Sequence, residues 1–236
     1  MHTFCFSIRR RRLASALVLG GLAARLPAQA AATTNTPPPS ASILVLGDSL
    51  SAEYGLRRGS GWVALLTQRL ARMHAPWQVV NASISGDTTA GGRARLPALL
   101  QRHHPAVVVL ELGANDALRG LPIGQTEAHL SAMVRMAQAA GARVLLVGMQ
   151  VPPNYGPAYT HQFAQVFQAV SRQQKTGLVP FLLAGVADAP QPLQWFQADR
   201  LHPNERAQGR MEANVWPSLA PLLRAAPHSS RGVARR

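Results

Sequence analysis

Two polar clusters in the chain hold the side chains that serine-based catalysis requires. Gly47-Asp48-Ser49-Leu50 offers a hydroxyl, and Asp199-Arg200-Leu201-His202 offers a carboxylate and an imidazole three residues apart. A serine becomes a nucleophile when a histidine takes its proton and a carboxylate holds that histidine in one tautomer. The spacing lets the side chains of Asp199 and His202 converge from one turn. We therefore predict Ser49 as nucleophile, His202 as base and Asp199 as the orienting acid.

Two further loops offer donors for the oxyanion that such a reaction forms. Gly86 follows Ile84-Ser85, and Asn115 lies in Gly113-Ala114-Asn115-Asp116. A glycine lets a backbone N–H approach a ligand closely, and an asparagine amide donates hydrogen bonds. We predict an oxyanion hole made of the Ser49 and Gly86 N–H groups and the Asn115 amide. Each residue alone is also explained as a turn or helix-cap residue, and their co-occurrence favours the catalytic interpretation.

These residues must be positioned by a regular framework, and the hydrophobic pattern indicates one. Short apolar runs alternate with longer amphipathic segments. The predicted strands are 43–46, 78–81, 106–112, 143–149 and 178–181, and the predicted helices are 61–73, 90–103, 125–139, 157–174 and 205–223. Such alternation predicts right-handed crossovers and a parallel sheet covered on both faces. We expect an α/β fold, a three-layer α/β/α sandwich of about five strands, with ligands at the carboxyl ends of the strands.

The amino-terminal segment is typical of an export signal. Within residues 1–32, a basic run at 9–12 precedes an apolar stretch at 13–26 and then small residues. This stretch is shorter than the roughly 18 residues of a membrane-spanning helix, so we predict no permanent membrane anchor. We expect a periplasmic or secreted protein after cleavage. The only cysteine, Cys5, leaves with this segment, which excludes cysteine catalysis in the mature chain.

The remaining chain contains one predicted domain. A length of 236 residues with 47% hydrophobic content is enough for a single full-sized core. We predict a flexible leader at 33–41, a folded domain at 42–223 and a basic disordered tail at 224–236.

The formal charge of +14 raises the question of nucleic-acid binding. Many of the arginines crowd the two ends of the chain, outside the predicted domain. These are Arg9, Arg10, Arg11, Arg12, Arg25, Arg224, Arg231, Arg235 and Arg236. No basic stripe interleaved with aromatic residues is present, so we predict no nucleic-acid partner. No His-Glu-x-x-His or comparable ligand spacing is present either, so we predict no metal.

The four clusters resemble the blocks of the SGNH or GDSL-type esterase superfamily, named for serine, glycine, asparagine and histidine. Ser49, Gly86, Asn115 and His202 match these four residues. The surrounding segments, among them Val151-Pro152-Pro153-Asn154-Tyr155-Gly156, are similar to the bacterial arylesterase, acyl-CoA thioesterase I and lysophospholipase L1 branch. The resemblance implies a flavodoxin-like sheet order and hydrolysis through a serine acyl-enzyme, with neither cofactor nor metal.

The chain departs from this branch at two positions. Glu53 stands where the branch has glycine, and Ala114 replaces the second glycine of Gly-Gly-Asn-Asp. Neither position touches a catalytic role, and we expect Glu53 to alter the entrance near the nucleophile.

The substrate is predicted from two loops, 118–123 and 151–159, in which apolar residues meet proline and glycine. The candidates for an acyl-chain groove are Leu118, Leu121, Val151, Pro152 and Tyr155. We therefore expect a small-molecule ester or thioester substrate. A carbohydrate or peptidoglycan O-acetylesterase is the alternative enzyme, and a non-catalytic periplasmic binding module is the alternative of another class. The sequence leaves the oligomeric state open.

Overall fold

The sheet is built around β1 (Ala41–Gly47), in a computed structural model that describes residues 41–224. Four successive side chains of β1, Ile43 to Leu46, are fully buried. An uninterrupted apolar run of this kind is typical of a central parallel strand, because helices cover both of its faces. The other strands are β2 (Trp77–Asn81), β3 (Val107–Glu111), β4 (Arg143–Val147) and β5 (Gly177–Val179).

All five strands are parallel and follow the order β2-β1-β3-β4-β5. From β1 the chain passes first to β2 on one side and then to β3 on the other. This is the flavodoxin-like order, and the point where the direction reverses lies between β1 and β3. Ligands in such sheets bind outside the carboxyl ends of the strands at that point.

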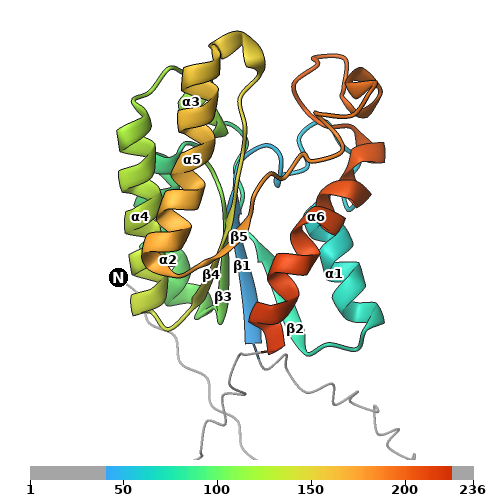
Figure 1. The fold of residues 1–236 in the computed structure, drawn as a ribbon. Coiled ribbons are helices and arrows are strands. Elements are labelled where there is room, and N and C mark those ends of the chain that lie inside the picture. Colours follow the sequence, from blue (N-terminus) through green and yellow to red (C-terminus); the bar gives the residue numbers. More distant parts are fainter. Residues whose placement is uncertain (1–40, 225–236) are drawn as a thin grey trace, which may run out of the picture. The chain divides into compact units, whose positions relative to one another are not determined.

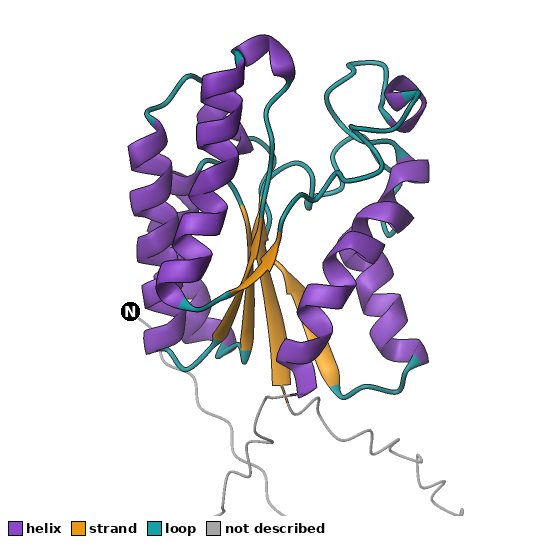
Figure 2. Ribbon diagram, viewed as in Figure 1, coloured by secondary structure: helices purple, strands orange, loops and turns teal. Residues whose placement is uncertain are grey.

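Helices cover both faces of the sheet, as Figures 1 and 2 show. One face carries α2 (Thr89–His103), α4 (Ile123–Ala139) and α5 (Pro157–Gln174). The other carries α1 (Trp62–Arg72) and α6 (Glu205–Arg224). The predicted three-layer α/β/α sandwich with five parallel strands is confirmed.

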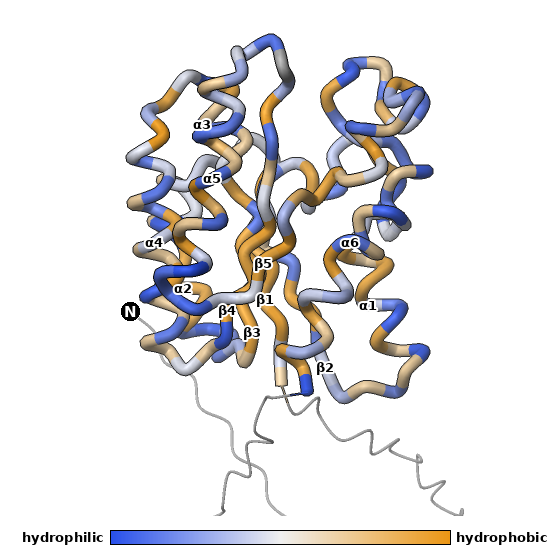
Figure 3. Tube along the Cα trace, viewed as in Figure 1, coloured by the Kyte–Doolittle hydropathy of each residue, from blue (hydrophilic) through white to orange (hydrophobic). Residues whose placement is uncertain are grey.

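The core lies between these layers, where Figure 3 shows the strands as the most hydrophobic part of the trace. All five residues of β3 are buried. Helix α5 buries Phe163, Val166, Phe167 and Val170, a spacing that forms one stripe along an α-helix. Packing of such stripes on the sheet fixes the strand ends that carry the polar loops.

Several boundaries differ from those predicted. Strand β5 ends at Val179 because Pro180 has no N–H to continue the ladder. Helix α2 continues through Pro97, so this proline does not mark a helix boundary. The sequence pattern did not predict the short helix α3 (Ala114–Leu118) or the 3₁₀ turns η1 (Pro153–Tyr155) and η2 (Pro192–Trp195), because segments of this length show no helical periodicity.

The domain elements extend from Ala41 to Arg224, one residue beyond the predicted limits at each end. The predicted export signal, the leader up to residue 40 and the tail beyond Arg224 lie outside the described residues. Within residues 41–224, no helix combines the length and apolar character needed to cross a bilayer.

Candidate active site

The predicted nucleophile, Ser49, lies in the turn that follows β1. The N–H groups of Ser51 and Ala52 donate to the carbonyl of Asp48, at 3.2 and 2.9 Å, and close this turn. Gly47 is required at its start, because a Cβ there would lie 2.7 Å from both the Glu111 carboxylate and the Ser51 hydroxyl. The turn therefore presents Ser49 at the carboxyl end of a central strand.

His202 lies between Ser49 and Asp199. Its Nε2 atom is 3.0 Å from Ser49 Oγ, and its Nδ1 atom is 2.7 Å from Asp199 Oδ2. The second carboxylate oxygen of Asp199 accepts the N–H groups of Leu201 and His202, each at 3.0 Å. The backbone N–H of His202, then that of Leu201 and the imidazole, lower the pKa of Asp199 to about 2. Asp199 is therefore an anion at neutral pH, and it fixes the tautomer of His202 that leaves Nε2 facing Ser49.

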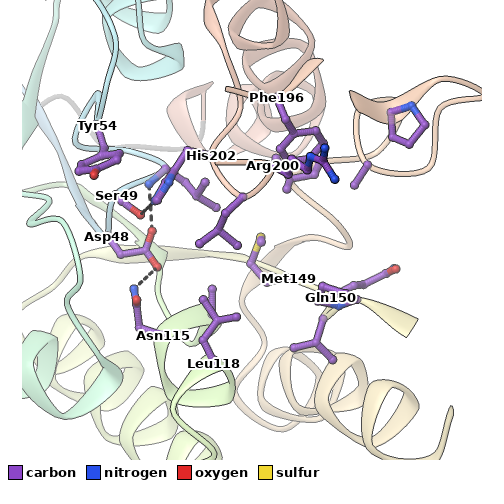
Figure 4. A pocket seen from close by; sticks show the side chains of 18 of the residues that line it. Asp48, Ser49, Tyr54, Asn115, Leu118, Met149, Gln150, Phe196, Arg200 and His202 are labelled. Atoms are coloured by element: carbon purple, nitrogen blue, oxygen red, sulfur yellow. Dashed lines mark hydrogen bonds between the residues drawn. The ribbon is translucent and has the colours of Figure 1, made fainter. Parts of the chain in front are cut away.

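The residues of the predicted oxyanion hole, Ser49, Gly86 and Asn115, line one cavity, and Figure 4 shows Asn115 beside Asp48, which precedes Ser49. Gly86 has φ +79°, a backbone conformation that favours glycine, and its carbonyl accepts a 2.7 Å bond from Arg119. Among residues 41–224, the N–H groups of Ser49 and Gly86 take part in no hydrogen bond. The Asn115 amide nitrogen donates to Asp48 Oδ2 and to the Asp87 carbonyl, both at 3.0 Å, which fixes the plane of the amide.

A pair of buried carboxyl groups, Asp48 and Glu111, lies behind the Ser49 turn. Glu111 Oε2 accepts the Ser51 hydroxyl at 2.7 Å and the Asp48 N–H at 3.3 Å. Burial raises the pKa of Glu111 well above its ordinary value, and the neighbouring Asp48 adds to the shift. Burial also raises the pKa of Asp48 to about 6, although the Leu50 N–H that it accepts lowers it. The two carboxyl groups therefore stabilise the turn that carries Ser49 through hydrogen bonds to Asp48, Leu50 and Ser51.

Two residues that contact the site were not predicted from the sequence. Glu111 is one of them, although a charged residue inside an apolar strand was a visible signal. Tyr54 is the other: its ring lies 4.4 Å from the His202 ring, centroid to centroid, at 40°. Nothing in the local pattern marks an exposed tyrosine as a neighbour of a histidine far away in the sequence.

A cavity of about 790 Å³ opens beside Ser49 and His202. Figure 4 shows side chains from widely separated segments meeting around it. Its wall is mainly apolar, and the apolar residues are Leu50, Ala114, Leu118, Met149, Val151, Pro152, Phe181, Leu183, Ala187, Pro192, Leu193, Phe196 and Leu201. A wall of this kind is suited to a hydrocarbon chain.

The structure places only some of the predicted substrate residues on this wall. Leu118, Val151 and Pro152 line the cavity, whereas Leu121 and Tyr155 do not. The N–H of Leu121 caps α3 by donating to the Asp116 carbonyl at 2.9 Å. The Tyr155 ring stacks on Tyr159, with 6.0 Å between centroids.

The position of Glu53 also differs from the prediction that this residue alters the entrance near Ser49. Glu53 is not part of the cavity wall. Its carboxylate accepts the N–H of Gly59 at 2.9 and 3.1 Å and that of Gly61 at 2.8 Å. Glu53 has φ +60°, a conformation that glycine adopts more easily. Its hydrogen bonds brace the loop that leads into α1.

No cluster of three or more histidine, cysteine or acidic residues able to hold a metal ion occurs within the described part of the chain. The polar groups next to the cavity form instead a hydroxyl–imidazole–carboxylate series with N–H donors beside it. Such an arrangement can perform acyl transfer through a serine.

The sequence profile of the GDSL-like lipase/acylhydrolase family matches residues 45–210. The chain is 52% identical to esterase TesA of Pseudomonas aeruginosa over 210 residues, which cover 88% of this chain and 99% of that protein. It is 41% identical to thioesterase 1/protease 1/lysophospholipase L1 of Escherichia coli K12 over 186 residues, covering 77% and 85%.

A solved structure shows the same similarity. The crystal structure of TesA matches with a TM-score of 0.74 at 54% sequence identity, over 77% of this chain and 99% of that one. The matched profile includes Ser49, Gly86, Asn115 and His202 within its limits.

Proposed function

The chain belongs to the GDSL-like lipase/acylhydrolase family and is a hydrolase of ester bonds, and we propose that Ser49, His202 and Asp199 form its catalytic triad. The observation that carries this proposal is the position of His202, whose two ring nitrogens lie 3.0 Å from Ser49 Oγ and 2.7 Å from Asp199 Oδ2. Membership in a hydrolase family also argues against the alternative function of a non-catalytic periplasmic binding module.

In the proposed reaction, His202 Nε2 takes the proton of Ser49 as Oγ attacks the carbonyl carbon of the substrate. His202 then gives this proton to the departing oxygen or sulfur, and an acyl-enzyme remains on Ser49. Water enters, loses its proton to His202 and attacks the acyl carbon. His202 returns the proton to Ser49 Oγ and the carboxylic acid leaves.

The proposed oxyanion hole consists of the Ser49 and Gly86 N–H groups and the Asn115 amide. The two backbone donors are unengaged among the described residues, and both residues line the cavity. The amide nitrogen of Asn115 already donates to Asp48 and to the Asp87 carbonyl. In the proposed reaction, the oxyanion shares one of these two N–H groups with its present acceptor. Donors fixed in this way need no reorganisation when negative charge develops.

We propose that the substrates are acyl esters and thioesters whose hydrocarbon chain lies in the cavity. The supporting observation is the apolar wall of the 790 Å³ cavity, to which Leu118, Val151 and Pro152 contribute. The names of the E. coli relative, thioesterase and lysophospholipase, describe leaving groups of both kinds. A binding site for acetate alone does not need a cavity of this size.

We also propose export to the periplasm or beyond. This rests on the sequence of residues 1–32, with its basic run, its apolar stretch and its small residues before the cleavage point. Sequencing the amino terminus of the protein purified from the periplasm tests it, and a mature chain that retains Arg9 to Arg12 contradicts it.

The chain-length profile tests the substrate proposal. We expect kcat/KM for p-nitrophenyl esters to rise from acetate toward medium or long chains, because each added methylene gains apolar contact. A strict preference for acetate contradicts the proposal and supports the alternative, a carbohydrate or peptidoglycan O-acetylesterase. If the purified wild-type protein hydrolyses none of these esters, the enzymatic function itself is contradicted.

A further inference from the structure

Arg200 stands out on the cavity wall by its charge. Apart from His202, it is the one basic side chain among the described residues that line the cavity. The acidic lining residues are already engaged: Asp48 accepts the Leu50 N–H, and Asp188 accepts the Gly185 N–H. The cavity therefore carries one guanidinium within a mainly apolar wall, together with two carboxyl groups that are held by backbone N–H groups.

The backbone of Arg200 is in the left-handed region, with φ +57°. The other non-glycine residues with positive φ in the described chain are Glu53, His74, His104 and Lys175. His74, His104 and Lys175 terminate helices, a common place for this conformation. Glu53 uses its carboxylate to brace a loop. Among the non-glycine residues with positive φ between residues 41 and 224, Arg200 is the one that neither follows a helix nor uses its side chain in a hydrogen bond.

The guanidinium of Arg200 has no ionic partner in the described residues. The ion pairs of arginine between residues 41 and 224 involve Arg57, Arg69 and Arg95. The cation–π contacts of that part of the chain involve Arg69 and Arg206. A guanidinium that lines a cavity and forms no ion pair in the described residues is free to bind an anion of the substrate.

Arg200 belongs to the same turn as the proposed acid–base group. Its N–H donates to the Gln197 carbonyl at 3.0 Å, and Asp199 Oδ1 holds the N–H groups of the next two residues at 3.0 Å each. The base of the Arg200 side chain is therefore fixed relative to His202. Arg200 is thus two residues from His202, the group proposed to protonate the leaving group.

We propose that Arg200 forms a binding site for a phosphate group carried by the leaving group of the substrate. This inference rests on the proposed function. A guanidinium binds phosphate oxygens through two parallel N–H bonds, which gives affinity and direction. Phosphate-bearing leaving groups of acyl substrates occur in lysophospholipids and in acyl-CoA, and the chemistry at Arg200 is the same for both.

Three substrates with one acyl chain test the proposal: palmitoyl lysophosphatidylglycerol, palmitoyl-CoA and the neutral ester 1-palmitoylglycerol. We expect Arg200→Gln to lower kcat/KM for the phosphate-bearing substrates about tenfold or more, chiefly through KM, because a charged hydrogen bond is lost. The neutral ester should change less than about twofold. Arg200→Gly removes the guanidinium and suits the left-handed backbone, so it should reproduce the same selectivity without strain.

Arg172→Gln is the matched control, because Arg172 lies in the last turn of α5 and is not part of the cavity wall. It makes the same change in net charge and should leave all three kcat/KM values unchanged. Added salt at ~1 M should reduce the preference of the wild type for the phosphate-bearing substrates, since it screens the contact. An equal loss on all three substrates, or an unchanged ratio in both Arg200 variants, overturns the proposal.

The two phosphate-bearing substrates distinguish the source of the ligand. A loss for lysophosphatidylglycerol alone identifies a glycerophosphate site, and a loss for palmitoyl-CoA alone identifies a nucleotide site.

A binding measurement separates this inference from the proposed function. Calorimetric titration of glycerol 3-phosphate and of coenzyme A into Ser49→Ala protein should show binding that Ser49→Ala/Arg200→Gln weakens about tenfold. Absence of binding overturns the phosphate site even if ester hydrolysis is normal. Binding without hydrolysis by the wild type supports the site and contradicts the proposed function.

Discussion

The amide nitrogen of Asn115 lies 3.0 Å from the carboxylate of Asp48, the residue that immediately precedes Ser49. The proposed oxyanion donor that follows β3 is thus tied to the turn of the proposed nucleophile that follows β1 (Figure 4). These strands are neighbours at the point where the sheet order reverses. The contact holds two separately encoded parts of the site in one geometry.

Removing the Asn115 amide should slow the reaction without weakening substrate binding. We expect Asn115→Ala to lower kcat about 100- to 1,000-fold with little change in KM, because the donor acts mainly on charge that develops in the transition state. Asn115→Asp has a similar size but no amide donor and should lose as much. Steady-state kinetics with one p-nitrophenyl ester measures both, and a wild-type kcat in Asn115→Ala contradicts the assignment.

Tyr54 should assist catalysis through its ring and not through its hydroxyl. The ring lies 4.4 Å from the His202 ring, and aromatic contacts of this kind are worth about 0.5–1.5 kcal/mol. We expect Tyr54→Ala to lower kcat roughly 2- to 10-fold, since His202 loses a wall that limits its motion. Tyr54→Phe keeps the ring and should behave like the wild type. Equal losses in the two variants contradict a role for ring packing.

Glu111 should make stability depend on pH. Its folded-state pKa is raised above the ordinary 4.5, so folding favours its protonated form. The stability that it contributes is fully present below that value and is lost as pH rises toward the raised pKa. Glu111→Gln has no charge to bury, so its free energy of unfolding relative to the wild type should increase from about pH 5 to about pH 8. Urea unfolding across this range measures the difference, and a constant difference contradicts the prediction.

Glu53 should affect stability and not chain-length preference. Its carboxylate accepts three hydrogen bonds from Gly59 and Gly61, and it is not on the cavity wall. We expect Glu53→Ala to lower the free energy of unfolding by about 1–3 kcal/mol while the p-nitrophenyl ester profile keeps its shape. Glu127→Ala on α4 is the control and should change stability by less than about 0.5 kcal/mol. A shifted chain-length optimum in Glu53→Ala contradicts this account.

The layers of the fold and the positions of the polar loops follow from hydrophobic periodicity, which was strong enough to predict them. Helix α5 spans the predicted residues 157–174, because Pro157 at its start and its apolar stripe both appear in the sequence. The short α3 helix was missed, since five residues complete too little of a helical period to show a pattern. Strand ends were uncertain where one proline, such as Pro180, decides how far the ladder extends.

The polar contacts of the site depend on tertiary packing, so the sequence predicted fewer of them. The Ser49, Gly86, Asn115 and His202 motifs were visible because they lie in loops with unusual residue combinations. The cavity wall was only partly predicted. Leu118 lines the cavity, whereas the N–H of Leu121 caps α3. This difference follows from the position at which α3 ends, and the sequence did not predict α3.

The assignment of Ser49 as nucleophile is tested most directly by covalent labelling. We predict that an organophosphonate inhibitor adds one group to the purified protein, that peptide mass spectrometry places it on Ser49 Oγ, and that activity falls in proportion. Ser49→Ala should remain folded by circular dichroism, take up no label and lose esterase activity. A label on another residue, or full activity in Ser49→Ala, would contradict the account.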